Sequence, residues 1–241
     1  MGRIIVAGGS RAAAPVAGVP LGTIAEGQII KLRENGTQME FYVAKHNYEP
    51  TLNGNGRTLL VRKLIHPEMQ FSATSARYTG SNIDNYLQNT YAATLDAAVS
   101  QAAAGTKFLS YLPNVTATQC TVTHNVLTRK VFTLSYTELT GNSIDTYTYN
   151  SGDESWQKDG FVYEGQQVPI ASSLLTDSNI NPFTRTWACS PSNTDRVYVV
   201  RDRHGGGTLQ PYTSSYPFFI GVGLPATTLF TPKTMEFKGV A

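Results

Sequence analysis

The chain has 241 residues, with 19 Lys and Arg against 17 Asp and Glu, so its net charge is only +2. Charged residues make up 15% of it, below the roughly 25% of an ordinary soluble protein. This near-neutral balance argues against nucleic-acid binding, which needs clustered cations to neutralise phosphates. No run approaches the roughly 18 consecutive apolar residues of a membrane-spanning helix, so we expect no membrane span.

The first 25 residues are rich in Gly, Ala and Pro and carry almost no charge. This composition is typical of an arm or linker, so the sequence predicts an arm over residues 1–25 and one folded domain over residues 26–241. Gly8-Gly9 follows a short apolar run, as the glycines of a nucleotide-binding loop do. Such a loop needs a helix directly behind it, but Pro15 and Pro20 stand where that helix would lie, which argues against nucleotide binding. The same run is too short for a secretory signal peptide.

Three short strands are predicted directly after the arm, because β-branched and aromatic residues are dense there and turn residues separate them. Asn35-Gly36 is a strong two-residue hairpin signal, and we expect the glycine-rich residues 52–56 to form a loop. The three strands cover residues 28–32, 39–44 and 58–62. Together they predict an antiparallel meander.

Helical signals follow between residues 81 and 104. Ser81 has an acid three positions later, which is a weak capping box, and apolar residues then recur at helical spacing up to Tyr91. The alanine-rich stretch after Leu95 stops at Gly105, a plausible residue for the left-handed position after a helix. The pattern predicts two short helices or one broken helix.

Strands and loops dominate the rest of the chain. Residues 135–139 resemble one capped helical turn, and residues 141–160 are rich in Asn, Asp and Gly, which indicates a long loop or hairpin insertion. Further strands are predicted over residues 121–127, 130–134, 183–188, 197–201 and 218–222. Strands, then helices, then strands again indicate an α+β fold.

No catalytic or metal-binding constellation stands out. Cys120 and His124 share one face of a predicted strand, but four extended residues span about 13 Å, too far to ligate one metal ion. No histidine stands in a zinc-protease motif, and the four are His46, His66, His124 and His204. Cys120 and Cys189 fit two free thiols or one bridge. We therefore expect no enzyme, no metal and no cofactor.

The strongest local feature is the stretch of residues 194–216, where Arg and Tyr gather. Both residue types are enriched in recognition surfaces, because they combine large contact area with hydrogen-bonding groups. The alternative is a hairpin with a solvated, charge-paired tip. The candidate contact residues are Arg196, Tyr198, Arg201, Arg203, Tyr212 and Tyr216.

An ordered series of segments resembles a family of domains of unknown function that is common in phages and prophages of Gram-positive gut bacteria. The series covers most of the chain between residues 20 and 230. Its segments are residues 26–32, 40–49, 52–63, 83–91, 105–108, 131–139, 169–172 and 187–191. The chain departs from the family pattern at Cys189, where the family usually has Arg, and at residues 216–219.

This resemblance implies a C-type-lectin-like fold, shared with phage host-attachment proteins and sulfatase-modifying oxidases, with a mixed antiparallel sheet, two short helices and long loops. The oxidases need a pair of metal-binding cysteines near the carboxyl end. Here only Cys189 lies there. The resemblance therefore does not extend to the oxidase chemistry.

The resemblance implies a bacteriophage virion surface protein, associated with the tail or baseplate. Its arm would dock to the particle, and residues 195–216 would contact a host-surface glycan or protein through aromatic stacking and arginine hydrogen bonds. Other virion proteins and further copies of the chain are the expected partners. A capsid decoration or head-fibre protein is the alternative. A third hypothesis, an enzyme acting on cell-wall glycan, would rest on Asp153, Glu154 and Asp159 as paired carboxylates.

Overall fold

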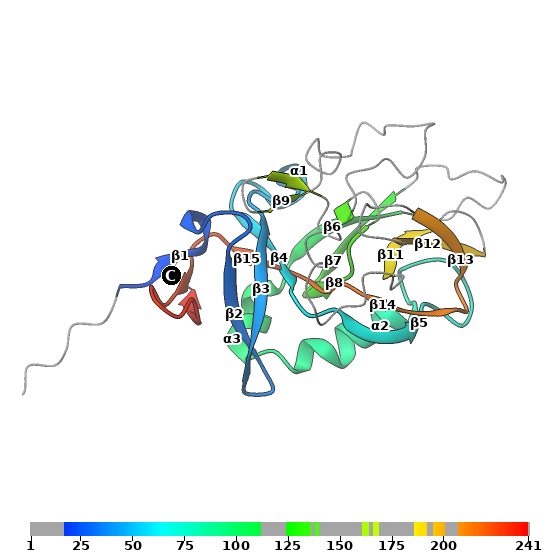
Figure 1. Cartoon of the computed structure of the whole chain (residues 1–241), viewed down its shortest axis with the longest axis horizontal. Coiled ribbons are helices and arrows are strands. Elements are labelled where there is room, and N and C mark those ends of the chain that lie inside the picture. Colours follow the sequence, from blue (N-terminus) through cyan, green and yellow to red (C-terminus); the bar gives the residue numbers. More distant parts are fainter. Residues whose placement is uncertain are drawn as a thin grey trace, which may run out of the picture.

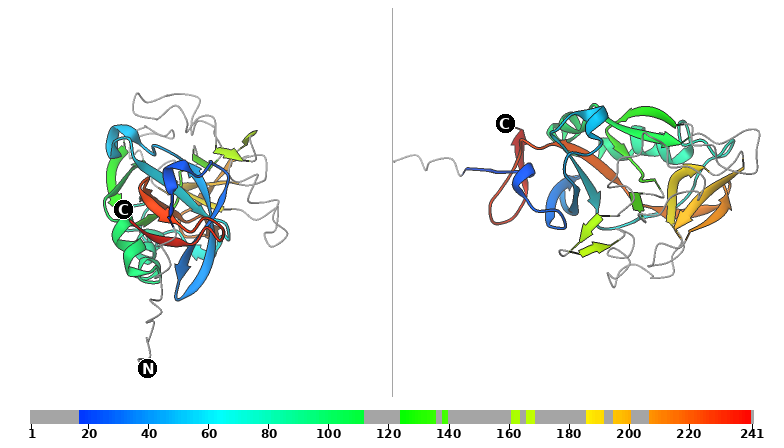
Figure 2. Two further views of the ribbon diagram at one scale, coloured as in Figure 1. Left: turned by 90° about the vertical axis from the view of Figure 1, so that its left-hand side faces the viewer. Right: turned by 90° about the horizontal axis from the view of Figure 1, so that it is seen from above.

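The computed structural model is an α+β fold of mostly antiparallel sheets with a few short helices (Figure 1). Two five-stranded sheets follow one another along the long axis of the molecule (Figures 1 and 2). The structure describes residues 17–111, 124–135, 138–139, 161–163, 166–168, 186–191, 195–200 and 207–240.

The first sheet confirms the predicted meander. Its order is β2-β3-β4-β15-β8 and every pairing in it is antiparallel. Asn35 and Gly36 both adopt positive φ, 48° and 80°, as a two-residue hairpin of this type requires. The strands are β2 (Ile29–Glu34), β3 (Thr37–Lys45), β4 (Arg57–Arg62), β8 (Val131–Phe132) and β15 (Gly221–Pro225).

The second sheet is mixed. Its order is β13-β12-β11-β14-β5, and β11 runs parallel to β14 while its other pairings are antiparallel. The sequence does not predict β5, because its mixture of charged and apolar residues has no strand period. The strands are β5 (His66–Gln70), β11 (Thr186–Pro191), β12 (Arg196–Val200), β13 (Gly207–Pro211) and β14 (Ser215–Phe218).

The predicted strand over residues 218–222 is wrong, because this stretch ends one strand and begins another. Phe218 closes β14 in the second sheet, and Gly221 opens β15 in the first. Phe219 and Ile220 between them are fully buried. A continuous apolar run does not distinguish one buried strand from a buried crossing between two sheets.

The two ends of the fold meet. The short strand β1 (Val19–Pro20) pairs with β16 (Thr228–Phe230), which pairs with β17 (Phe237–Val240), and Figures 1 and 2 show these strands together at one end. Leu21 and Ile24 are buried, so residues 19–25 belong to the packed domain rather than to the predicted arm. The Gly- and Pro-rich composition of this stretch is typical of a linker, although its apolar side chains pack into the core. Residues 1–16 of the predicted arm lie outside the described residues.

The two predicted helices are confirmed as α2 (Asn82–Asn89) and α3 (Ala97–Ala103), with the 3-10 turn η2 (Tyr91–Ala93) between them. The Ser81 hydroxyl accepts a hydrogen bond from the Asp84 amide, 3.0 Å away, and Gly105 follows α3 with φ of 86°. Helix α2 packs against β5 and β8, and α3 packs against β15. The helices therefore cover parts of both sheets.

The predicted loop over residues 52–56 is corrected in part, because α1 (Pro50–Asn53) is a helical turn. Proline is tolerated at the first helical position, and Gly54 with φ of 69° ends the turn. The Asn53 side chain donates to the Lys107 carbonyl and accepts from the Lys107 amide, at 2.9 and 2.8 Å. These tertiary contacts with β6 select the helical turn.

Two two-stranded pairs complete the described fold. The hairpin β6 (Thr106–Tyr111) and β7 (His124–Arg129) pairs over all twelve residues, and β9 (Phe161–Tyr163) pairs with β10 (Gln166–Val168). The remaining short element is the 3-10 turn η1 (Leu21–Thr23). The capped turn predicted after Phe132 is confirmed, since Ser135 and Glu138 exchange side chain-to-backbone hydrogen bonds of 2.7 and 3.1 Å.

Aromatic rings stack in the core between the β2-β3-β4 meander and the β6–β7 hairpin. Phe132 lies between Phe108, at a centroid distance of 4.5 Å, and Tyr48, at 5.8 Å. The buried Tyr48 hydroxyl donates to Glu138 over 2.8 Å, which ties the capped turn to the core. Stacked pairs of this kind add about 0.5–1.5 kcal/mol each beyond their burial.

Gly223 permits a close approach of β15 to the start of β6. A Cβ atom at this position would clash with Thr106 Cγ2 and lie 2.7 Å from its Oγ1. Thr106 is fully buried, and its hydroxyl contacts Arg57 Nη1 and the Ala103 carbonyl at 3.1 and 2.9 Å. The Thr106 side chain therefore cannot move away from a Cβ atom added at position 223.

We expect Gly223→Ala to lower the free energy of unfolding by about 1–3 kcal/mol, the usual cost of overpacking a core. Gly221→Ala is the matched control in the same strand, since the atom nearest to its added Cβ would be Phe132 Cε2, 3.2 Å away. Urea unfolding of both variants measures the difference. An equal loss in the two variants would show that the contact with Thr106 does not set the cost.

Candidate functional site

The open end of the β12–β13 hairpin brings together two of the six predicted contact residues. Arg196 begins β12 and pairs with Pro211 at the end of β13, and the Tyr212 amide donates to the Asp195 carbonyl over 3.2 Å. Asp195, Arg196 and Pro211 are exposed, while Tyr212 is half-buried. A cation, an exposed proline and an aromatic ring thus lie at one corner of the mixed sheet.

Tyr212 is anchored from the other side as well. Its carbonyl accepts a hydrogen bond from the Ser72 amide at 3.0 Å, and its side chain packs against the core. Tyr212 is therefore held at its amide, at its carbonyl and along part of its ring.

Tyr216 lies on a different face from Arg196. Its ring meets the fully buried Trp187 edge-on at a centroid distance of 5.0 Å, and its hydroxyl donates to Gln210 over 3.1 Å. Trp187 in turn donates its indole N–H to the Met69 carbonyl at 2.9 Å. Tyr216 therefore belongs largely to the packing that joins β11, β14 and β5.

The contact surface of six residues stays a prediction, because the structure describes the side chains of only three of them, Arg196, Tyr212 and Tyr216. Side chains alternate between the two faces of a sheet, so residues close in sequence are divided between solvent and core. Tyr198 pairs with Leu209 through the backbone, and its side chain lies outside the description. Arg201 and Arg203 also lie outside the described residues.

A second polar cluster, which the sequence does not predict, lies where β2 and β4 end. The Arg62 guanidinium makes two-pronged contact with the Glu34 carboxylate, at 2.9 Å from Nε to Oε1 and 3.1 Å from Nη2 to Oε2. Only about a tenth of each side chain is exposed, 11% and 10%. The Tyr91 hydroxyl also donates to Glu34, and burial next to this carboxylate raises the pKa of Tyr91.

His66 and Tyr86 border this ion pair. His66 Nδ1 lies 3.0 Å from the Pro67 carbonyl, which can only accept, so Nδ1 carries the proton and Nε2 accepts from the Tyr86 hydroxyl at 2.8 Å. Burial lowers the pKa of His66 and nearby Arg62 lowers it further, although the Pro67 carbonyl and Glu34 act in the opposite direction. The imidazole is stacked on Phe218 at 4.5 Å. These contacts are those of a satisfied, neutral histidine.

One signal in the sequence could have pointed to this cluster. Arg62 directly follows the apolar run Leu59-Leu60-Val61, and Glu34 stands directly before the hairpin turn. A charge at the end of a buried strand needs a partner of opposite sign. Strand register decides which residue becomes that partner, and the local sequence pattern does not determine the register.

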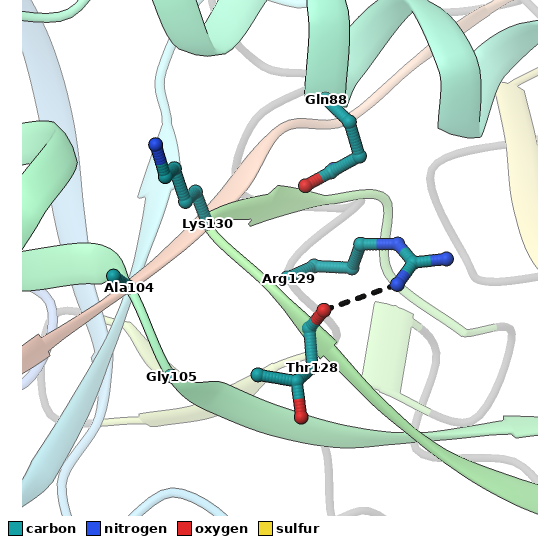
Figure 3. Close-up of a pocket in the computed structure, with 6 residues that line it drawn as sticks. All are labelled: Gln88, Ala104, Gly105, Thr128, Arg129 and Lys130. Carbon is teal, nitrogen blue, oxygen red and sulfur yellow. Dashed lines mark hydrogen bonds between the residues drawn. The ribbon is translucent and has the colours of Figure 1, made fainter.

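A pocket of about 280 Å³ opens between α2, the turn from α3 to β6 and the end of β7 (Figure 3). Its lining residues are Gln88, Ala104, Gly105, Thr128, Arg129 and Lys130. None of them was a predicted contact residue.

The sequence predicts no metal site and no membrane span. Within that part no group of three or more His, Cys, Asp or Glu side chains could hold a metal ion. No helix of the described residues is long and apolar enough to cross a membrane. Cys120, His204 and the acidic residues Asp153, Glu154 and Asp159 lie outside the described residues, as does the side chain of Cys189.

Comparison with known proteins adds one family. A family model described as "Domain of unknown function (DUF6273)" matches residues 55–208, which is more than half of the chain. The match begins just before β4 and ends within β13. The chain matches no curated protein and no solved structure.

Proposed function

We propose that this chain, which belongs to the DUF6273 family of domains of unknown function, is a non-enzymatic surface protein of a bacteriophage particle. In this proposal it sits at the tail or baseplate and contacts a glycan or protein of the host surface. The proposal rests on the resemblance of its ordered segments to phage-encoded domains. It also rests on the corner of the mixed sheet where the exposed Asp195, Arg196 and Pro211 lie beside the half-buried Tyr212.

The proposed fold family is C-type-lectin-like. Two features of the described structure support this: a mixed sheet and the two short helices α2 and α3. A fold hosts many functions, so the host-binding proposal depends on the corner rather than on the fold. That corner is the single observation that carries it.

The corner has the composition of a recognition surface. Arg196 offers a planar guanidinium with several N–H groups, and Tyr212 offers a ring with a hydroxyl at low cost in side-chain entropy. Arg196 is about half exposed, with 47% of its side chain accessible, and its contact with Asp195 is long at 4.0 Å. An exposed pair at this distance contributes little to stability.

The location of the protein on the particle tests the proposal directly. Gold-labelled antibodies against the full chain, imaged on intact phage particles, should mark the tail end. Label confined to the head would overturn the tail-tip proposal and support a capsid decoration or head-fibre protein. Absence of label on particles that infect normally would show that the chain is not part of the virion.

We expect Arg196→Ala and Tyr212→Ala each to weaken binding of the purified chain to host cells by about thirtyfold, since hot-spot residues contribute about 2 kcal/mol. Arg33→Ala is the matched control, because Arg33 is similarly exposed in the other sheet and makes a similarly long contact with Asp96. Flow cytometry with labelled protein measures binding. Thermal melting identifies a loss that reflects unfolding, and unchanged adsorption by folded variants would exclude the corner as the contact site.

A further inference from the structure

The pocket between α2 and the end of β7 contains a rigidly held guanidinium. Arg129 donates to both oxygens of Asp84, at 2.8 Å from Nε and 3.0 Å from Nη2. Asp84 is almost fully buried at 3% exposure, and it also accepts from the Gly80 amide at 3.0 Å. The hydrogen bond from Arg129 to this carboxylate raises the pKa of the guanidinium, so Arg129 remains charged in any ordinary buffer.

Arg129 retains hydrogen-bonding capacity after these contacts. A third N–H group donates from Nη1 to the Thr128 carbonyl at 3.0 Å. A guanidinium has five N–H groups, so two remain for a ligand. The ion pair with Asp84 thus orients the guanidinium without using all of its donors.

Lys130 adds a second cation. It stands between β7 and β8, is exposed, and has no acidic side chain within ion-pair distance among the residues that the structure describes. Val131 and Phe132 directly after it are fully buried, which holds the backbone in place. Asp84, Arg129 and Lys130 together leave one net positive charge at the pocket.

Gln88 and Thr128 supply neutral polar groups. The Gln88 amide nitrogen donates to the Val131 carbonyl, so its oxygen is the atom left for other contacts. Figure 3 shows the Gln88 side chain pointing from α2 toward the β7–β8 chain, with Lys130 and Arg129 on either side of it in this view. The Thr128 hydroxyl is on an exposed residue of β7 and can donate or accept.

We propose that this pocket binds a small hydroxylated anion, a polyol or sugar that carries a phosphate ester or a carboxylate. Lys130 and Arg129 lie on either side of Gln88 (Figure 3), so the Lys130 ammonium contacts the anionic group, and Gln88, Thr128 and the remaining N–H groups of Arg129 contact the hydroxyls. A volume of about 280 Å³ is just below the range of drug-sized sites, which suits a single ring or a short polyol. The pocket is separate from the corner at Arg196, so the proposal stands or falls independently of host contact.

Calorimetric titration of the full chain tests this proposal with three probes: glycerol 3-phosphate, glucuronate and neutral glycerol. We expect binding of at least one of the anions, weakened by added salt as for any accessible charge pair, and no binding of glycerol. Binding of glycerol 3-phosphate alone identifies a phosphate-ester site, and binding of glucuronate alone identifies a carboxylate site. Absence of binding by both anions at 10 mM would overturn the proposal.

Lys130 variants test whether the binding occurs at this pocket. We expect Lys130→Gln to weaken binding about tenfold or more and Lys130→Arg to retain it. Lys233→Gln is the matched control, because Lys233 is exposed in the turn between β16 and β17 and its replacement changes the net charge equally. The position 130 variants are preferred to changes of Arg129, which would leave Asp84 buried without its partner. Equal binding by Lys130→Gln and the unmodified chain would locate the anion elsewhere and overturn the assignment.

Discussion

Replacement of Arg62 by Met is expected to lower the free energy of unfolding by about 3–5 kcal/mol, because it leaves the buried Glu34 carboxylate without its cation. Glu34 would retain only the hydrogen bond from Tyr91 among the contacts described for its carboxylate. Urea unfolding of the variant and of the unmodified chain at pH 7 measures the loss.

The double variant Glu34→Gln with Arg62→Met is the control for this prediction. It removes both charges while keeping similar volumes, and such replacements are often neutral or stabilising. We expect the double variant to be more stable than Arg62→Met alone, with a coupling free energy that the double-mutant cycle gives directly. If the double variant were as unstable as the single one, packing of the Arg62 stem and its 2.6 Å bond to the Leu64 carbonyl would carry the effect instead.

Trp187→Ala is expected to be the second severe substitution, with a loss of about 3–5 kcal/mol in the free energy of unfolding. The indole is fully buried, meets Phe71 and Tyr216 at centroid distances of 5.3 and 5.0 Å, and bonds to the Met69 carbonyl. It thus joins the central strand β11 to both β14 and β5. Its truncation leaves a cavity at the centre of the mixed sheet.

The damage from Trp187→Ala should be greatest in the second sheet. Amide hydrogen exchange is expected to accelerate more in β5 and β14 than in β2 and β3, because regions open according to their own local stability. Trp187→Phe is the control, since it keeps an aromatic ring and loses the indole N–H bond, and we expect a smaller loss from it. Uniform acceleration in both sheets would mean that they unfold as one unit.

The turns and caps of this fold were predictable from the sequence, and the site was predictable only in part. Arg196 and Tyr212 were expected to lie on a contact surface, and the structure brings them to one corner through the Arg196–Pro211 pairing and the Tyr212–Asp195 hydrogen bond. Tyr216 was expected beside them and lies against Trp187 instead. The pattern of residue types indicated recognition, but strand pairing decided which side chains reach solvent.

What the sequence determined by itself is local. Asn35-Gly36 formed the hairpin turn, Ser81 capped α2, Gly105 followed α3, and Ser135 with Glu138 closed a capping box. Each of these depends on backbone preferences and hydrogen bonds within a few residues. Neighbours in sequence suffice to specify such features.

The tertiary structure decided everything that joins distant segments. The pairing of Glu34 with Arg62, the parallel contact of β11 with β14, and the passage of Phe219 and Ile220 between two sheets each depend on register and sheet order. The pocket at Lys130 likewise combines Gln88 of α2, the turn at Gly105 and the end of β7, which are far apart in the sequence. Burial is a property of the whole fold, so a local run of residues cannot state which partner a charged side chain will meet.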